Sequence, residues 1–314
     1  PTPSPPRATP KPSATPLPAL LSGPGWQQEW SGTSKDLTGV EFIDRLHGWA
    51  VGAGGTIMAT TDGGSKWTAQ RSGVTADLNS VSFVDTLHGW AAGDADTLVV
   101  TSNGGATWTV EHTGTGGQLS GVQFIDASHG WVVDGMPEQL LATVDAGRHW
   151  TAVTTPLVVT AARVADALHG WATNGQSMMS TGDGGTTWTT ATTARVSLLW
   201  IVCTSPSVAY AANGNEPFLE ATADGGKTWS DRGPIPVLTH GIAALGASQL
   251  WAVGLGTGGP PLMPTFTISS DGGVTWTAHE LTTPTAQSPE AVSAVDPSDA
   301  WVVGQGGLIV KLAG

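Results

Sequence analysis

Short segments of alternating apolar and polar residues recur along most of the chain, separated by turns rich in Gly, Asp, Asn and His. In the first complete unit these segments cover residues 37–44, 48–52, 56–61 and 66–71. Alternation with a period of two predicts β-strands, and short Gly- and Asp-containing connections predict hairpins between them. Each unit therefore predicts four antiparallel strands, which we name A to D in chain order, with strand A innermost.

Two markers accompany these units and show that they are repeats. The first is an aromatic residue after a tight turn, and it recurs at intervals of 39 to 50 residues, at Trp49, Trp90, Trp131, Trp171, Tyr210, Trp251 and Trp301. The second is the octapeptide Ser/Thr-x-Asp-Gly-Gly-x-x-Trp, which ends at Trp67, Trp108, Trp150, Trp188, Trp229 and Trp276. A period of about 40 residues with four short strands is typical of a propeller blade. The sequence predicts an all-β, seven-bladed β-propeller with four antiparallel strands per blade.

The seventh blade lacks its own outer strand. Residues 304–312 match strand C of the other blades, and the sequence ends without an octapeptide. At the other end, residues 26–32 align with residues 67–73, which form strand D of the first blade. We therefore expect residues 26–32 to pair with residues 307–312 and close the ring, which removes the open sheet edges that favour aggregation.

The chain divides into a spacer and a folded part. Pro, Ser and Thr dominate residues 1–21, a composition typical of an extended, solvated linker. Residues 22–314 form the predicted propeller. Because such a spacer often follows a removed signal or an anchor, and the sequence starts without Met, we expect an extracytoplasmic protein that is secreted or tethered to the cell envelope through this linker; a disordered tail on a cytoplasmic protein is the alternative.

Composition excludes several classes of function. The net charge is −13 with only 12 Lys and Arg residues, which argues against nucleic-acid binding. The single Cys203 excludes an internal disulfide and a zinc site built on cysteines. No run of 18 apolar residues occurs, so no transmembrane segment is expected. We expect no cofactor, no metal and a monomeric chain.

The octapeptides indicate a structural turn more strongly than a calcium site. Their acidic or amide side chains can accept backbone N–H bonds within the C–D hairpin, at Asp62, Asn103, Asp145, Asp183, Asp224 and Asp271. Calcium is the functional alternative, but a calcium loop needs several carboxylates and each of these loops has one. Four His residues precede Gly in the A–B turns, at His47, His88, His129 and His169. They lie in different blades, so we interpret them as turn-stabilising donors.

One position of strand A varies in chemistry. Blades 1 to 4 place consecutive polar residues there, Glu41, Ser82, Gln123 and Arg163. Trp200 begins strand A of blade 5 and has no place in the repeat. The hypothesis is a polar pocket with an aromatic wall in the central channel; the alternative is a water-filled channel with an Arg–Glu contact. The B–C and D–A loops vary most, and binding residues concentrate on such loops, so we place partner binding on that face.

The combined pattern V-x-F-x-D-x-x-H-G-W-x-x-G and T-x-D-G-G-x-x-W resembles the photosystem II assembly and stability factor family, whose octapeptide is the Asp-box or BNR repeat of sialidase-like propellers. The resemblance covers all seven blades and implies a non-catalytic scaffold that docks membrane-protein partners. The photosynthetic members carry a basic Arg patch, whereas the seven Arg residues here are scattered.

These observations favour a non-catalytic binding or scaffold propeller that docks a protein partner through the loop-rich face, with a membrane-associated protein as one candidate. The alternatives are a glycoside hydrolase and a carbohydrate-binding propeller. A hydrolase would use two carboxylates, with candidates on the variable loops at Asp94, Asp96, Asp134, Glu138 and Glu216. A sialidase would need a Tyr nucleophile, and the one Tyr210 occupies a structural marker position. A sugar binder would use Trp200 or Trp30.

Overall fold

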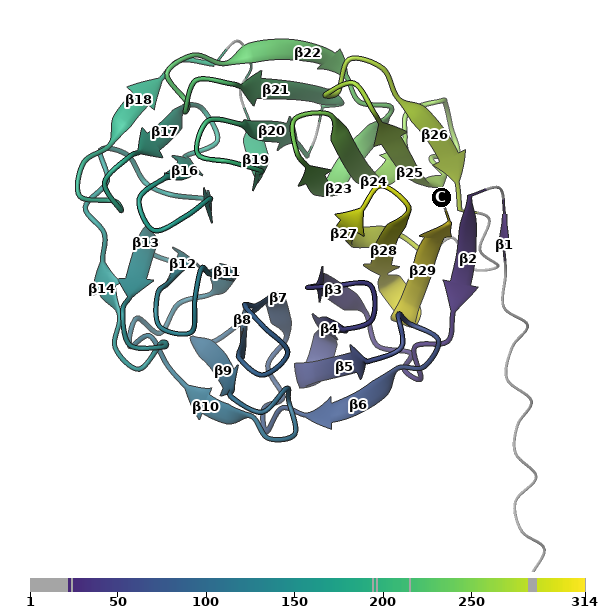
Figure 1. Cartoon of the computed structure of the whole chain (residues 1–314), viewed down its shortest axis with the longest axis horizontal. Helices are drawn as coiled ribbons and strands as arrows, with labels where there is room; N and C mark the ends of the chain where they lie inside the picture. The colour runs from purple at the N-terminus through teal and green to yellow at the C-terminus, as the bar shows by residue number, and fades with distance from the viewer. Residues whose placement is uncertain are drawn as a thin grey trace, which may run out of the picture.

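The computed structural model describes residues 22–23, 25–193, 195, 197–214, 216–281 and 287–313. The spacer predicted for residues 1–21 lies outside this set. The described residues form seven antiparallel sheets arranged as a ring around a central channel (Figure 1). The prediction of an all-β, seven-bladed propeller is confirmed. In the described part of the chain, no helix has the length and hydropathy needed to span a bilayer.

Each complete blade follows the order A to D from the channel outward. Blade 1 consists of β3 (Leu37–Phe42), β4 (Gly48–Gly52), β5 (Thr56–Thr60) and β6 (Thr68–Arg71). Blade 2 consists of β7 (Leu78–Phe83), β8 (Gly89–Gly93), β9 (Thr97–Thr101) and β10 (Thr109–Glu111). Blade 3 consists of β11 (Leu119–Phe124), β12 (Gly130–Gly135), β13 (Glu138–Thr143) and β14 (Thr151–Ala152). Short 3₁₀ turns follow β4 and β28, at η1 (Ala53–Gly55) and η2 (Gln305–Gly307).

The second half of the ring repeats the arrangement. Blade 4 consists of β15 (Ala161–Val164), β16 (Gly170–Thr173), β17 (Met178–Thr181) and β18 (Thr189–Ala191). Blade 5 consists of β19 (Leu198–Cys203), β20 (Ala209–Asn213), β21 (Phe218–Thr222) and β22 (Ser230–Pro234). Blade 6 consists of β23 (Val237–Leu245), β24 (Gln249–Gly256), β25 (Pro264–Ser269) and β26 (Thr277–Glu280). Blade 7 contributes β27 (Pro289–Asp296), β28 (Asp299–Gly304) and β29 (Leu308–Ala313).

The N-terminal strand closes the ring, as predicted. β2 (Trp26–Glu29) pairs antiparallel with β29, with Trp26 opposite Leu312 and Glu29 opposite Ile309. In Figure 1 the dark purple β2 lies beside the yellow β29. The structure adds a short β1 (Ser22–Gly23), which pairs with β2 and gives blade 7 a fifth strand. The first and last strands thus complete one sheet.

Aromatic side chains hold three of the blade junctions. The last residue of strand A is Phe in blades 1 to 3, and its ring stacks on the marker Trp of the preceding blade with centroids 3.5–3.6 Å apart, in the pairs Phe42–Trp301, Phe83–Trp49 and Phe124–Trp90. The opposite side of each Phe ring lies against the Gly that precedes the blade's own marker Trp. A Cβ on Gly89 would lie 2.2 Å from the Phe83 ring. The His-Gly-Trp motif therefore needs Gly to admit the Phe ring.

The other junctions lack this arrangement. The Phe position holds Val164, Cys203, Ala244 and Ala294 in blades 4 to 7, and the Gly position holds Ala209, Leu250 and Ala300 in blades 5 to 7. Blade 4 retains Gly170, where a Cβ would lie 2.7 Å from the ring of Trp131. Trp131 and Val164 line a cavity of about 220 Å³ between blades 3 and 4. In blades 5 to 7 the Phe and the Gly are lost together, whereas in blade 4 Gly170 is still needed to admit the Trp131 ring.

Candidate functional site

The polar residues of strand A join neighbouring blades. In each case the side chain bonds the backbone of the next blade's strand A: Glu41 Oε2 accepts from Phe83 N–H (2.5 Å), Ser82 Oγ from Phe124 N–H (3.1 Å), Gln123 Oε1 from Val164 N–H (2.9 Å) and Ser293 Oγ from Phe42 N–H (2.9 Å). Gln123 Nε2 also donates to the Val164 carbonyl at 2.9 Å. These side chains turn sideways along the channel wall, which gives each a structural role at a blade junction.

Arg163 differs from the other members of this row. Its guanidinium is half-buried and donates to the carbonyl of Ala162 at 3.0 Å. No carboxylate of the described residues lies within ion-pair distance of it. Burial lowers the pKa of Arg163 below its usual value, but an Arg side chain stays protonated at neutral pH.

The two ionisable groups that interact electrostatically with Arg163 are Glu41 and Cys203, and both are neutral at pH 7. Burial raises the pKa of Glu41 to about 8, against the opposing effects of the Phe83 N–H and Arg163. Burial also raises the pKa of the Cys203 thiol to about 11. Cys203 Sγ lies 3.3 Å from the Val164 carbonyl, to which it donates. Arg163 is therefore a positive charge that no ionised neighbour balances.

Arg163 and Trp200 line a common cavity of about 200 Å³. It lies where the inner strands β11, β15 and β19 begin, at the end of the channel that carries the D–A and B–C loops. Leu199 and Trp200 are 39% and 36% exposed there, which is high for inner-strand residues of this size. The structure thus brings together Arg163 and Trp200 of the hypothesised pocket, whereas Glu41, Ser82 and Gln123 do not line this cavity.

Two of the loop carboxylates fix the loops of blades 2 and 3. Asp94 Oδ1 accepts from Asn79 Nδ2 (2.9 Å) and Gln118 Nε2 (2.8 Å). Asp134 is fully buried and accepts from the Met136 N–H at 3.0 Å. Both carboxylates have structural partners within their own or an adjacent loop, so neither is available to activate a water or protonate a leaving group.

The remaining loop carboxylates do not form a catalytic pair either. Asp96 accepts from the backbone N–H groups of Thr113 and Gly114, each at 3.0 Å. Burial acts to raise its pKa, but these bonds and the Thr113 hydroxyl hold it below the usual value, whereas a glycosidase acid needs a raised pKa. Glu138 and Glu216 are exposed, on blades 3 and 5.

The octapeptides form a uniform turn. In each, the hydroxyl of the first residue donates to the Asp or Asn oxygen, and that oxygen accepts the N–H four residues later. In blade 1, Thr60 Oγ1 donates to Asp62 Oδ1 and Lys66 N–H donates to the same oxygen, both at 2.9 Å. The corresponding acceptors are Asn103, Asp145, Asp183, Asp224 and Asp271, at 2.8–3.0 Å. Each Asp-box oxygen closes a C–D hairpin.

The four turn histidines each contact one Asp of their own blade. His47 Nδ1 lies 2.8 Å from the Asp44 carboxylate, whose Oδ1 also accepts the N–H groups of Leu46 and His47. His88, His129 and His169 repeat this contact with Asp85, Asp126 and Asp166. Within the described ranges, no cluster of three or more His, Cys, Asp or Glu side chains is arranged to hold a metal ion.

Sequence and structure comparisons agree on the type of propeller. The family model described as photosynthesis system II assembly factor YCF48 matches residues 20–110 and 72–155. These residues run from the closing strand to the end of blade 3, where the Phe–Gly–Trp arrangement is complete. A comparison with curated protein sequences found no match.

Solved structures share the fold over almost the whole chain. YCF48 bound to D1 peptide has a TM-score of 0.72 at 21% identity, covering 94% of this chain and 98% of that one. YCF48 from Cyanidioschyzon merolae has a TM-score of 0.71 at 17% identity, covering 92% and 98%. A GH74 xyloglucanase from Xanthomonas campestris has a TM-score of 0.72 at 16% identity, covering 94% of this chain but 54% of the enzyme. The identities are low, so these likenesses establish the fold. The chain is a seven-bladed β-propeller of the type found in the photosystem II assembly factor YCF48, whose repeat it carries in its first three blades.

Proposed function

We propose that this propeller is a non-catalytic binding protein that docks a polypeptide partner, and that the Arg163–Trp200 cavity takes a carboxylate of that partner beside an apolar side chain. The observation that carries the proposal is the unbalanced charge of Arg163 at the wall of an open cavity. A half-buried guanidinium without an ionised neighbour is stabilised by an incoming carboxylate, because charge-assisted bonds are strong when partly desolvated. Leu199 and Trp200 supply the exposed apolar wall.

Two further observations support this proposal. The structural relative YCF48 was solved with a bound D1 peptide, so a propeller of this type does take a peptide ligand. The loop carboxylates considered for hydrolysis are engaged in turns or exposed on separate blades, which favours binding over hydrolysis.

The test is a calorimetric titration with a short peptide that ends in an apolar residue and a free carboxylate, and with the same peptide amidated at its C-terminus. We expect the free acid to bind and Arg163→Gln to weaken it by roughly 10- to 150-fold, the equivalent of a charged hydrogen bond of about 1.5–3 kcal/mol. Arg71→Gln, at an exposed arginine on β6, is the matched control. Equal binding of the amidated peptide, or unchanged affinity in Arg163→Gln, would contradict the proposal.

We further propose that the protein works outside the cytoplasm, since the Pro/Ser/Thr-rich composition of residues 1–21 suits a spacer between an envelope anchor and the propeller. Fractionation of cells producing the natural protein should find it in the envelope or the medium. Recovery from the cytosol alone would exclude this location without affecting the peptide-binding proposal. A pull-down from a membrane fraction, with and without residues 1–21, tests whether the spacer contributes to binding of the partner.

A further inference from the structure

A polar slot recurs between the outer strand of one blade and the Asp-box of the next. The residue three positions after the outer-strand Trp fills it. Between blades 1 and 2 this residue is Gln70, whose Oε1 accepts from Trp108 Nε1 (3.1 Å) and whose Nε2 donates to the Gly104 carbonyl (2.9 Å). Between blades 7 and 1 it is Glu29, whose Oε2 accepts from Trp67 Nε1 at 3.3 Å. At both junctions this side chain fills the slot and accepts a hydrogen bond from the Asp-box Trp of the next blade.

Between blades 2 and 3 the side chain at this position does not bond the Asp-box Trp of the next blade. The equivalent residue is Glu111, and the Trp that would bond it, Trp150, instead donates its Nε1–H to the Gly147 carbonyl of its own Asp-box at 3.0 Å. The Glu111 carboxylate makes no hydrogen bond or ion pair with any described residue and is partly exposed. A pocket of about 570 Å³ occupies this junction.

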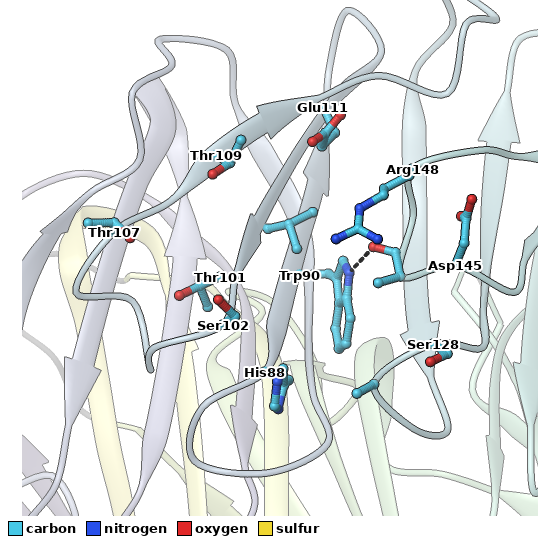
Figure 2. Close-up of a pocket in the computed structure, with 13 residues that line it drawn as sticks. His88, Trp90, Thr101, Ser102, Thr107, Thr109, Glu111, Ser128, Asp145 and Arg148 are labelled. Carbon is cyan, nitrogen blue, oxygen red and sulfur yellow. Dashed lines mark hydrogen bonds between the residues drawn. The ribbon is translucent and has the colours of Figure 1, made fainter.

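Figure 2 shows this pocket, with the guanidinium of Arg148 directed into it and Glu111 at its upper edge. Arg148 comes from the Asp-box of blade 3, and the equivalent position is Ser65, Ala106, Thr186, Lys227 or Val274 in the other boxes. Like Glu111, Arg148 has no ion-pair partner among the described residues. The junction therefore combines a carboxylate, Glu111, that bonds no described residue with an arginine, Arg148, that no other Asp-box carries.

The rest of the lining is rich in hydroxyl groups. The side chains of Ser102, Thr109 and Ser128 line the pocket and bond no other described side chain or backbone group. The other two titratable side chains of the lining already have partners: Asp145 Oδ2 lies 2.6 Å from His149 Nδ1, and His88 Nδ1 lies 2.9 Å from Asp85. Glu111 and Arg148 are the two lining groups of opposite charge that have no partner among the described residues, and donors and acceptors of both kinds face the same space.

We propose that this pocket binds a neutral saccharide. The Glu111 carboxylate would accept from sugar hydroxyls, Arg148 would donate to sugar oxygens, and the three Ser and Thr hydroxyls would do both. Its volume is within the roughly 300–1,000 Å³ of small-molecule sites. The carboxylates of Glu111 and Asp145 disfavour an anionic ligand, and the guanidinium of Arg148 disfavours a cationic one. This site lies at the outer Asp-box side of blades 2 and 3, away from the Arg163–Trp200 cavity.

The experiment is a titration followed by calorimetry and saturation-transfer NMR, with neutral xylo-, cello- and malto-oligosaccharides, a uronic-acid oligosaccharide and a zwitterionic dipeptide, each carried into the millimolar range. At least one neutral oligosaccharide should bind. Glu111→Ala and Arg148→Ala should each lower its affinity at least about tenfold, the loss of one charged hydrogen bond. Lys227→Ala, the same change at the equivalent exposed position of blade 5, should have no effect.

Three outcomes would overturn the proposal. These are no binding of any neutral saccharide, binding that both pocket variants leave unchanged, or preferential binding of the uronate or the dipeptide that the same variants abolish. Glu111 is partly exposed and Arg148 is exposed, so the variants should fold, and thermal unfolding checks this. If either alanine variant fails to fold, Glu111→Gln and Arg148→Lys make the same test, because both alter the bonding groups with little change in size.

Discussion

The two sides of the ring fill the same junction position with different side chains. At the junctions before blades 1, 2 and 3, a Phe ring lies between a Trp and a Gly, with centroid distances of 3.5–3.6 Å. At the other four junctions the Phe is replaced by Val164, Cys203, Ala244 or Ala294. The propeller is complete on both sides. The backbone ladder and alternating pattern therefore suffice for a blade, and the aromatic sandwich adds packing energy at selected junctions.

The candidate binding cavity lies on the side without the sandwich. Arg163 and Trp200 belong to blades 4 and 5, where small or aliphatic residues take the Phe position. The family model covers residues 20–155, on the side with the sandwich. The Phe–Gly–Trp contact is thus confined to one side of the ring, whereas the Arg163–Trp200 cavity is built from blades that lack it.

The largest expected effect comes from removing one sandwich ring. Phe83→Ala should destabilise the fold by about 3–5 kcal/mol, because it leaves a cavity between Trp49 and Gly89. Val164→Ala, at the equivalent position of blade 4, should cost about 2 kcal/mol, because it removes two carbons beside an existing cavity. Denaturant unfolding measures both, and equal losses would refute the contrast between the two sides.

The Gly in the sandwich gives the next largest effect. Gly89→Ala places a Cβ 2.2 Å from the Phe83 ring, and such overpacking costs about 1–3 kcal/mol. The double variant Gly89→Ala/Phe83→Val should be less destabilised than the sum of the single changes, because the smaller side chain admits the Cβ. Strict additivity in this double-mutant cycle would show that Gly89 is needed for another reason.

The ring closure provides a pH-dependent effect on stability of up to about 3 kcal/mol, the equivalent of a rise in the pKa of Glu29 from 4.5 to about 7. Burial raises the pKa of Glu29 to about 7, opposed by the Trp67 bond and Lys311 and reinforced by Asp62. The raised pKa means that the folded state favours the protonated form, so stability falls as pH rises from the unfolded value near 4.5 to about 7, and is then constant. Glu29→Gln, which copies Gln70, should remove this fall and stabilise the protein at pH 8.

The reverse change supplies the control for the closure. Gln70→Glu should introduce a similar loss of stability with rising pH at the junction between blades 1 and 2, because a protonated carboxyl can still donate to the Gly104 carbonyl and an ionised one cannot. Melting temperatures from pH 5 to pH 8 compare the three proteins. A wild-type protein whose pH dependence is the same as that of Glu29→Gln would show that Glu29 does not titrate in this range.

The smallest effect concerns ligand affinity. Above pH 8 the Glu41 carboxyl loses its proton, since burial raises its pKa to about 8, and the new negative charge then offsets Arg163. Affinity for a carboxylate peptide should fall between pH 7 and pH 9 by less than about fivefold, as expected for an interaction below about 1 kcal/mol. Glu41→Gln should abolish this fall. An unchanged pH profile in that variant would show that Glu41 and Arg163 are not coupled.

The sequence predicted the ring because the repeat is periodic and residues 26–32 share the register of residues 67–73. It did not predict β1, because Ser22–Gly23 is too short to show alternation. It also missed the Phe–Gly–Trp sandwich, which joins residues of different blades. A signal for it was present, since Phe and Gly disappear together in blades 5 to 7.

The candidate site was only partly predictable. Arg163 and Trp200 stood out as departures from the repeat, and they line one cavity. Glu41, Ser82 and Gln123 had the same polarity, but a strand-A side chain can point into the channel or turn toward the neighbouring backbone, and the sequence does not distinguish these. The pocket beside Arg148 was missed because whether Glu111 has a hydrogen-bond partner depends on the orientation of Trp150, which the sequence does not show.

The central claim is that a peptide carboxylate binds beside Trp200, and indole ¹⁵N–¹H NMR tests it most directly. Each of the 15 Trp residues gives one side-chain N–H signal, and Trp200→Phe assigns the relevant one. On addition of the free-acid peptide, the Trp200 signal should shift while the buried junction signals of Trp49, Trp90 and Trp301 stay in place. A shift at Trp30 or at the junction residues with Trp200 unmoved would contradict the account.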